Sequence, residues 1–417
     1  MKSARIVVSV CLALLVATPI LLSWRNGTEA SALHADAEQP NVAAIDAAEY
    51  PTLQAAFDAV PDGGGLVRIP PGRFLLSEPL VLSRSETRVV GAGAATCLVN
   101  ANREGQPALI VRPANLDENP QAKLWRVQLA DFRICGDPEA VDAKSTEPAG
   151  GDGLLAQNVN EIYLHGLSID HHGGHGVNLV NCYEDPRISD SIFTYNRQAG
   201  VNIQGGHDIV VNANQFEENQ DALRCTDSFN LCMTGNNLDD HLGNGVVIEN
   251  TYGSVLSGNM IEECKGTAVV LDRDCYGITV SANVIAHNFG GGVDLRDAHG
   301  CAVSANTFTI VPRRAIVVGE KSGRITITGN NFSDSYIGGA ERRKANDQAA
   351  SGVVLAATTD VTLAGNSFSG LDGKAVQSTG KTRRVLFSGN LMADVADGHR
   401  ELKESHVSGN LESEPAK

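Results

Sequence analysis

The chain has 417 residues, of which 42% are hydrophobic and 20% are charged, a composition that allows a large buried core and excludes wholesale disorder. Its formal net charge of −16 argues against nucleic acid as the main partner, because phosphate binding relies on basic surfaces. The 43 glycines and an aromatic content of only 5% favour short strands joined by many tight turns.

The first 24 residues have the pattern of an export signal. Lys2 and Arg5 precede an almost wholly apolar run from Ile6 to Ser23. This run can serve either as a cleaved signal peptide or as an uncleaved N-terminal membrane anchor. Both interpretations predict that the remaining chain is secreted, periplasmic or on the cell surface. Residues 25–45, rich in Ala, Glu and Asp, are predicted to be a linker.

The later part of the chain repeats with a period near 23 residues. Each unit contains Ser/Thr-Gly/Ala-Asn, with an apolar residue two positions after the Asn. These apolar residues are Phe193, Phe216, Leu238, Ile261, Ile285, Phe308, Phe332, Phe368 and Met392. One interval is longer than the rest, and an insertion around 338–350 accounts for it. The period and the alternating Val and Ile runs predict short strands, three to a unit.

The asparagine of the repeat occupies one position in successive units. The members of this column are Asn214, Asn236, Asn259, Asn283, Asn306, Asn330, Asn366, Asn390 and Asn410. If each unit is one coil of a parallel β-helix, neighbouring rungs lie about 4.8 Å apart, so the side-chain amides can hydrogen-bond along the stack. Asn also tolerates the left-handed backbone that a tight turn requires.

With these features the chain resembles the right-handed parallel β-helix superfamily, the pectate-lyase-like proteins. Residues 51–61, Gly63-Gly-Gly and Ile69-Pro-Pro-Gly-Arg-Phe are similar to that superfamily's opening segment. The resemblance implies an all-β, single-stranded β-helix over residues 46–411, with a tail at 412–417. It also implies a short N-terminal capping helix, with Thr52 as N-cap and a buried face of Leu53, Ala56 and Phe57.

In this superfamily the asparagine ladder lies between the second and third strands of a coil, so the resemblance identifies the Gly/Ala-led strand as the first, on the substrate-groove face. Because side chains alternate along a strand, one outward column is predicted to contain Asn178, Asn202, Arg224, Val247, Val270 and Asp294. The next contains Val180, Gln204, Thr226, Glu249, Asp272 and Arg296, with Asp227, Arg273, Asp297 and Glu320 just beyond.

Charged residues of both signs thus gather on the first-strand face between about 221 and 297. Glu249 and Asp272, on adjacent rungs, are predicted to act as general acid and base or to hold Ca²⁺ bridging to a uronate. Arg224 and Arg273 are candidates for the lyase-type base or for binding the substrate carboxylate. The predicted substrate-binding residues are Asn178, Asn202, Asp227, Asp294, Arg296 and Asp297. The alternative is a solvated face of salt bridges.

Two functions remain open for this face. The favoured prediction is an extracytoplasmic polysaccharide lyase or hydrolase acting on a uronate-containing glycan; the alternative is a non-catalytic glycan-binding or cell-envelope structural protein. An enzyme should have a walled cleft over the first strands, whereas a scaffold should be flat, with each carboxylate neutralised by an arginine. A third option, a periplasmic metal-delivery protein, predicts a groove rich in His and Met, but the chain has only 4 Met.

Several further groups have more than one interpretation. His171, His172 and His175 with Asp170 could bind a metal or be ordinary polar residues of a turn. The insertions 137–151 and 338–350 are predicted to flank the groove, the second carrying Arg342, Arg343 and Lys344. Cys182, Cys225, Cys264, Cys275 and Cys301 are predicted to pack as small buried residues, with disulfides as the alternative.

Overall fold

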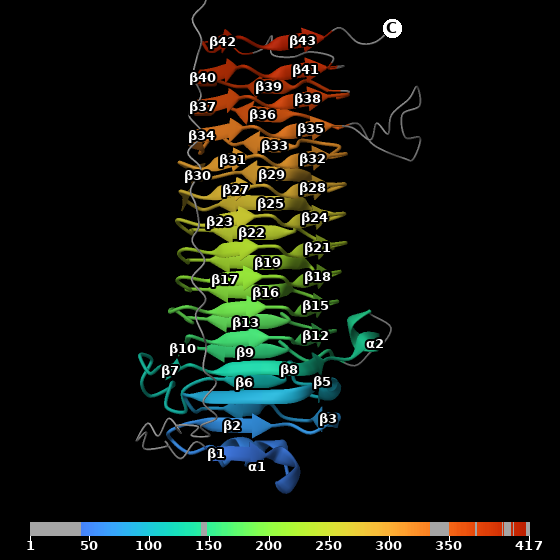
Figure 1. Ribbon diagram of the computed structural model, residues 1–417, viewed down its shortest axis with the longest axis vertical. Helices are drawn as coiled ribbons and strands as arrows, with labels where there is room; N and C mark the ends of the chain where they lie inside the picture. The colour runs from blue at the N-terminus through green and yellow to red at the C-terminus, as the bar shows by residue number, and fades with distance from the viewer. Residues whose placement is uncertain are drawn as a thin grey trace, which may run out of the picture. The chain divides into compact units, whose positions relative to one another are not determined.

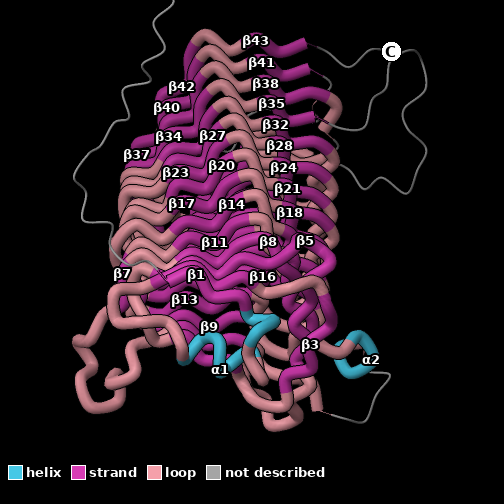
Figure 2. The backbone as a smooth tube through the Cα atoms, turned by 60° about the horizontal axis from the view of Figure 1, so that its bottom comes forward, coloured by secondary structure: helices cyan, strands magenta, loops and turns pink. Residues whose placement is uncertain are grey.

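The computed structural model describes residues 43–142, 148–333, 350–371, 373–393, 395, 402 and 404–413. Within them the chain winds into a stack of coils, each built from short parallel strands (Figures 1 and 2). The predicted leader, most of the predicted linker and the basic residues 342–344 lie outside the described residues. The first strand, β1 (Ala43–Asp46), begins three residues before the predicted start of the β-helix. Among the described residues, no helix has the length and hydropathy needed to cross a bilayer.

The first strands of the coils form a sheet of 12 parallel strands, here called the first-strand sheet. Its members are β4 (Leu80–Leu82), β6 (Leu109–Val111), β9 (Leu154–Gln157), β13 (Val177–Val180), β16 (Ala199–Gln204), β19 (Asp221–Thr226), β22 (Val246–Glu249), β25 (Thr267–Asp272), β29 (Gly291–Leu295), β33 (Ile316–Val318), β36 (Val353–Ala356) and β39 (Val376–Thr379).

The second strands of the coils pair with one another in the same way. They are β1, β2 (Gly65–Arg68), β5 (Thr87–Asn100), β8 (Gln128–Cys135), β11 (Tyr163–His165), β14 (Arg187–Ser189), β17 (Val210–Asn212), β20 (Cys232–Thr234), β23 (Val255–Ser257), β27 (Thr279–Ser281), β31 (Ala302–Ser304), β34 (Gly323–Thr328), β37 (Thr359–Ala364), β40 (Arg383–Ser388) and β42 (His406–Ser408). The long strands β5 and β8 extend into the third-strand layer as well.

The third strands complete each coil. They are β3 (Gly72–Leu76), β12 (Ser168–Asp170), β15 (Ile192–Thr194), β18 (Gln215–Glu217), β21 (Asn237–Asp239), β24 (Met260–Glu262), β28 (Val284–Ala286), β32 (Thr307–Thr309), β35 (Asn331–Ser333), β38 (Ser367–Ser369), β41 (Leu391–Ala393) and β43 (Leu411–Ser413). Short extra strands lie in the turns: β7 (Leu124–Trp125), β10 (Val159–Asn160), β26 (Cys275–Tyr276) and β30 (Ala298–His299).

The interior of the solenoid is apolar because every strand directs alternate side chains inward. The residues that follow the repeat asparagine by two positions are buried, and the rings of Phe308, Phe332 and Phe368 stack at centroid distances of 4.9 and 4.7 Å. Cys182, Cys225, Cys264, Cys275 and Cys301 are buried and carry free thiols, as predicted. Burial raises the pKa of Cys182, Cys225 and Cys264 to about 12, so these thiols are un-ionised at neutral pH.

Short helices lie at the N-terminal end of the stack and in one of its turns. A 3₁₀ turn (Ala47–Glu49) leads into α1 (Leu53–Asp58), where the Thr52 hydroxyl accepts a hydrogen bond from the backbone N–H of Ala55. Leu53, Ala56 and Phe57 of α1 are buried, and the Gln54 amide bonds to both backbone polar groups of Val81 on β4. The second helix, α2 (Pro138–Val141), lies in the predicted 137–151 insertion.

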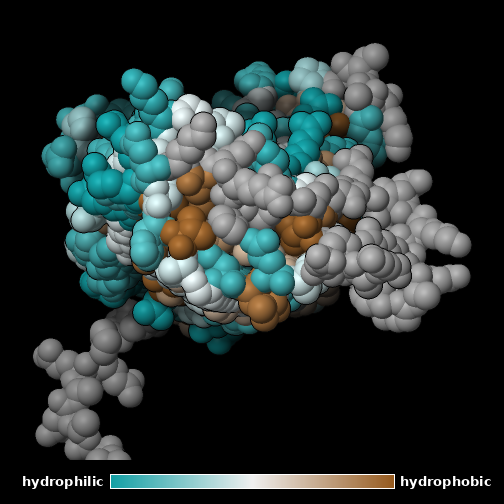
Figure 3. Space-filling view, turned by 90° about the horizontal axis from the view of Figure 1, so that it is seen from above, coloured by the Kyte–Doolittle hydropathy of each residue, from teal (hydrophilic) through white to brown (hydrophobic). Residues whose placement is uncertain are grey.

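At the other end, β42 and β43 form the last described coil. The side chain of Leu411 is exposed there. Figure 3, which looks onto this end, shows patches of apolar surface among polar side chains.

The predicted asparagine ladder is present from Asn214 to Asn410. Two groups of each asparagine, the backbone N–H and the side-chain Nδ2, donate to the Oδ1 of the next asparagine in the ladder. The Nδ2 to Oδ1 distances are 2.9–3.0 Å. The Nδ2 donates in addition to a backbone carbonyl near the end of the second strand in the preceding coil, such as Val280 for Asn306. The ladder therefore satisfies polar groups that would otherwise be buried unpaired.

The structure corrects one detail of the ladder. The residue with left-handed backbone is not the asparagine but the Gly or Ala before it, for example Gly258 at φ 67° and Ala282 at φ 54°. This explains why the motif reads Gly/Ala-Asn, since glycine adopts this conformation without steric cost. The asparagine instead contributes its side-chain amide.

Replacing one ladder amide should therefore be costly. We expect Asn306→Ala to lower the free energy of unfolding by about 3 kcal/mol, because it leaves buried donors and acceptors without partners. Guanidinium denaturation of the variant measures the loss. Asn237→Ala is the control, since among the described residues the half-buried Asn237 amide bonds only to Gln215, and its loss should cost less than about 1 kcal/mol. Equal costs for the two variants would refute a special role for the ladder.

A second polar column, which the sequence analysis did not identify, lies in the turn that leads into the first strand. Its members are buried: His172, Asn196, Asn219, His241, Cys264 and Asn288. Asn196 bonds to Asn219 through both its backbone N–H and its Nδ2, and the backbone N–H of Asn219 donates to Nδ1 of His241. Burial lowers the pKa of His172 and His241 to about 4, so both imidazoles are neutral at pH 7.

This column predicts a loss of stability in mild acid. The pKa of His241 is 6.5 when the side chain is exposed and about 4 when it is buried in the fold. The contribution of this histidine to stability is therefore fully present above pH 6.5 and is lost as the pH drops toward 4. We expect His241→Asn, which introduces the residue type used in neighbouring rungs, to reduce the difference in unfolding free energy between pH 7 and pH 5. Chemical denaturation at the two pH values measures it. If this difference is the same in the variant and the wild-type protein, His241 is not the group whose protonation destabilises the fold.

Candidate functional site

The outward columns of the first-strand sheet have the predicted register. Asn178 pairs with Asn202, Asn202 with Arg224, and the column continues through Val247 and Val270 to Asp294. Glu249 and Asp272 are direct partners on β22 and β25. Val247 and Val270 are 6% and 1% exposed although they point outward, so the middle of this face is packed rather than hollow.

Arg224 connects two carboxylates in a chain of ion pairs. Its Nη1 is 2.8 Å from Asp221 Oδ2, and its Nη2 is 3.0 Å from Glu249 Oε2. On the other side of Glu249, the Nη1 of Arg273 lies 4.0 Å from Oε1, and Arg273 Nη2 lies 3.8 Å from Asp227 Oδ1. Acidic and basic groups therefore alternate along the face.

The next rung continues the same alternation. Arg296 Nε donates to Asp294 Oδ2 at 2.8 Å, and its Nη1 lies 3.7 Å from Asp272 Oδ2. The Asp294 contact raises the pKa of Arg296 further above its usual range. Glu249 and Asp272 thus each have an arginine as charged neighbour. An arginine beside each carboxylate is the arrangement that the sequence analysis expects of a non-catalytic scaffold, although Glu249 and Asp272 also lie on adjacent rungs.

A second polar group on the same sheet was only partly predicted. Asn202 Nδ2 donates to Asn178 Oδ1 at 2.9 Å, and Asn178 Nδ2 donates to Asp152 Oδ2 at 2.9 Å. Asp152 Oδ1 accepts the backbone N–H of His175 at 2.7 Å. Asp152 and the buried Asp221 are site residues that were not predicted from the sequence. Asp152 lies two residues before β9 and Asp221 is the first residue of β19, where the repeat pattern gives no signal for a carboxylate that accepts a backbone N–H of the next coil.

The imidazole of His175 is fixed beside this group. Its Nδ1 accepts the backbone N–H of Ala199 at 3.1 Å. Burial is the main cause that lowers the pKa of His175, and the positive charge of Arg224 acts in the same direction. His175 therefore adds a neutral imidazole to the first-strand face.

An open hollow of about 550 Å³ lies where the chain enters β6, β9, β13 and β16. It is lined by Gly105, Pro107, Pro148, Ala149, Gly150, Gly151, Asp152, Gly173, Gly174, Arg197 and Gln198. Residues 148–151 of the 137–151 insertion contribute one wall, and Arg197 donates to the carbonyl of Val141 at the end of α2. The lining of the hollow does not include Glu249 or Asp272, the predicted catalytic pair.

The histidine group near residue 171 does not converge on one point. Asp170 accepts two hydrogen bonds from Arg133, at 2.7 and 2.8 Å, and contacts His171 Nδ1 at 2.7 Å. His172 is buried in the second polar column, and His175 faces the first-strand sheet. Their alternative interpretation, as polar residues of a turn, therefore describes them better. Asp297 lies in the turn after β29, where its backbone carbonyl accepts the N–H of Cys275.

Sequence comparison supports the architecture. The family model described as "Right handed beta helix region" matches residues 175–332 and 268–411, together more than half of the chain. No curated protein matches the chain.

Solved structures with the same fold have different activities. The A-module of the Azotobacter vinelandii mannuronan C-5 epimerase AlgE6 is 17% identical, with a TM-score of 0.55, over 89% of this chain and 100% of that one. The Streptococcus pneumoniae surface adhesin PfbA is 13% identical, with a TM-score of 0.55, over 83% and 94%. DFA-IIIase from Arthrobacter chlorophenolicus A6 is 13% identical, with a TM-score of 0.53, over 76% and 94%. At these identities the likeness shows the fold alone.

Proposed function

The chain belongs to the right-handed β-helix family, and we propose that it binds an acidic polysaccharide outside the cytoplasm along its first-strand sheet. The observation that carries the proposal is the row of guanidinium groups from Arg224 through Arg273 to Arg296, set between carboxylates on one packed face. Guanidinium groups can bind uronate carboxylates through paired hydrogen bonds, and the acids between them can accept hydrogen bonds from sugar hydroxyls.

The net charge of the chain restricts how such a ligand is held. A protein of charge −16 repels a polyanion at long range, and this repulsion is screened beyond about 8 Å at physiological ionic strength. Binding therefore depends on short-range contacts with the arginines. A Ca²⁺ ion held by Glu249 and Asp272 and bridging to a uronate would add a second attractive contact.

The named activities of two structural neighbours support a glycan as the ligand. One is a mannuronan epimerase, and another was solved as DFA-IIIase in complex with GF2. A third neighbour is a surface adhesin, which agrees with a binding role on a β-helix of similar length. The apolar run at residues 6–23 supports a location outside the cytoplasm.

The exposed arginines allow the binding face to be tested. The side chains of Arg273 and Arg296 are 55% and 51% exposed, so their replacement should leave the fold intact. We expect Arg273→Gln with Arg296→Gln to weaken binding to polyuronates about tenfold or more, an effect that isothermal titration with oligouronates can measure. Arg187→Gln is the matched control, because Arg187 is exposed on β14 of another layer. If the control weakens binding as much, the first-strand sheet is not the binding face.

Cleavage of the same glycan is a second candidate function, favoured by the direct pairing of Glu249 with Asp272 across adjacent rungs. A catalytic pair predicts that Glu249→Gln with Asp272→Asn abolishes turnover while the protein stays folded. Absorbance of unsaturated uronates detects a lyase, and reducing ends detect a hydrolase, each with and without a Ca²⁺ chelator. If the wild-type protein binds polyuronates but releases neither product, the binding proposal holds and the catalytic one is wrong.

A further inference from the structure

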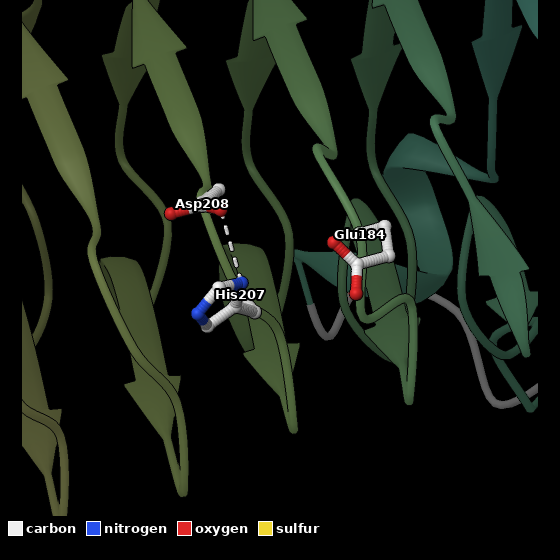
Figure 4. A group of neighbouring side chains, drawn as sticks. All are labelled: Glu184, His207 and Asp208. Carbon is white, nitrogen blue, oxygen red and sulfur yellow. Dashed lines mark ion pairs between the residues drawn. The ribbon is translucent and has the colours of Figure 1, made fainter.

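A separate group of side chains lies in the turns between the first and second strands of two neighbouring coils. Glu184 follows β13, and His207 and Asp208 follow β16 (Figure 4). Glu184 and His207 form an isolated parallel bridge, which fixes one beside the other. One ligand atom from each of the three residues lies within 4.8 Å of the others.

The imidazole of His207 is oriented by stacking. Its ring lies 5.1 Å from that of Tyr183 at an interplanar angle of 8°, and 5.9 Å from that of Phe229. Nδ1 is buried and lacks a hydrogen-bond partner, although the side chain as a whole is 29% exposed. This nitrogen lies 3.0 Å from Asp208 Oδ2, without the geometry of a hydrogen bond. The ring therefore presents a ligand atom to the carboxylates.

The carboxylates of Glu184 and Asp208 have a different charged environment from the acids of the first-strand sheet. Asp208 Oδ1 accepts a hydrogen bond from Asn230 Nδ2 at 2.9 Å, and its Oδ2 lies 3.0 Å from His207 Nδ1, a contact between charges only if the imidazole is protonated. Within the described part of the chain, neither Glu184 nor Asp208 forms an ion pair with a lysine or arginine. The acids of the first-strand sheet differ, since arginines flank them.

We propose that Glu184, His207 and Asp208 bind one Zn²⁺ ion. An imidazole nitrogen with two carboxylate oxygens suits zinc, whereas Ca²⁺ and Mg²⁺ prefer oxygen ligands alone. In a tetrahedral site with bonds of about 2.1 Å, ligand atoms are separated by about 3.4 Å. Side-chain rotation can close the present spacing to this value, because within the described residues no hydrogen bond or ion pair holds the Glu184 carboxylate. Water would fill the fourth position.

Such an ion would join two coils at the edge where the chain leaves the first-strand sheet. Because Glu184 comes from one coil and His207 with Asp208 from the next, the ion would fix the two turns to each other. Zinc binding should therefore raise the midpoint of thermal unfolding as well as occupy the site. This inference is independent of the proposed glycan binding.

The test uses the full chain, treated with a chelator and with its thiols alkylated so that cysteines such as the exposed Cys232 cannot bind the metal. Competition against a chromophoric zinc chelator should show one equivalent of Zn²⁺ bound. We expect Glu184→Gln and His207→Gln each to weaken binding at least tenfold, while His299→Gln has no effect. His299 is the matched control, because it lies at the corresponding turn position on β30.

Replacing Zn²⁺ by Co²⁺ gives a second measurement. A site of nitrogen and oxygen ligands gives a visible d–d spectrum without the near-ultraviolet band of a thiolate ligand. Glu184→Gln keeps the assay informative if His207→Gln does not fold, because the Glu184 carboxylate has no other described partner. Absence of saturable binding by the wild-type protein, or equal binding by Glu184→Gln, would overturn the proposal. Preference for Ca²⁺ over Zn²⁺ would also overturn it.

Discussion

The structure depends on a hydrogen bond between side-chain amides stacked one rung apart. Each asparagine between the two ends of the main ladder accepts the backbone N–H and the Nδ2 of its neighbour, and its own Nδ2 donates to the next amide and to a carbonyl of the preceding coil. Without these bonds, the corner between the second and third strands would bury unpaired backbone groups. Because the rungs from Asn214 to Asn410 use the same pattern, their coils stay in register, and residues one repeat apart lie above one another.

The common register brings charged residues from different coils together on one face. Arg224, Glu249 and Arg273 are far apart in sequence but contact one another because their coils are stacked. The alternation of charge along this face favours binding over acid–base catalysis, since each predicted catalytic carboxylate faces a guanidinium group. The hollow beside Asp152 offers a different environment on the same sheet, with the neutral imidazole of His175 close by.

Repetition explains what could be predicted. The asparagine column could be predicted because one residue type recurs at a fixed spacing. The outward columns could be predicted because inward and outward side chains alternate along each strand. The second column was missed because His172, Asn196 and Cys264 share a position but not a chemistry. Burial of Val247 and Val270 was missed because alternation gives the direction of a side chain but not what covers it. Glu184 was not predicted to lie beside His207, because the turn that contains Glu184 is one residue longer than the turn that contains His207. The observed bridge between the two residues shows that they occupy the same position in neighbouring coils.

Amide hydrogen exchange measured residue by residue tests the central claim most directly. If stacked amides hold the coils together, the backbone N–H groups of Asn236, Asn259 and Asn283, each bonded to a neighbouring Oδ1, should exchange only through global unfolding. Their exchange should be far slower than that of exposed turn amides. Exchange of these groups as fast as that of the turns would mean that the ladder does not form in solution, and the alignment of the charged face would lose its basis.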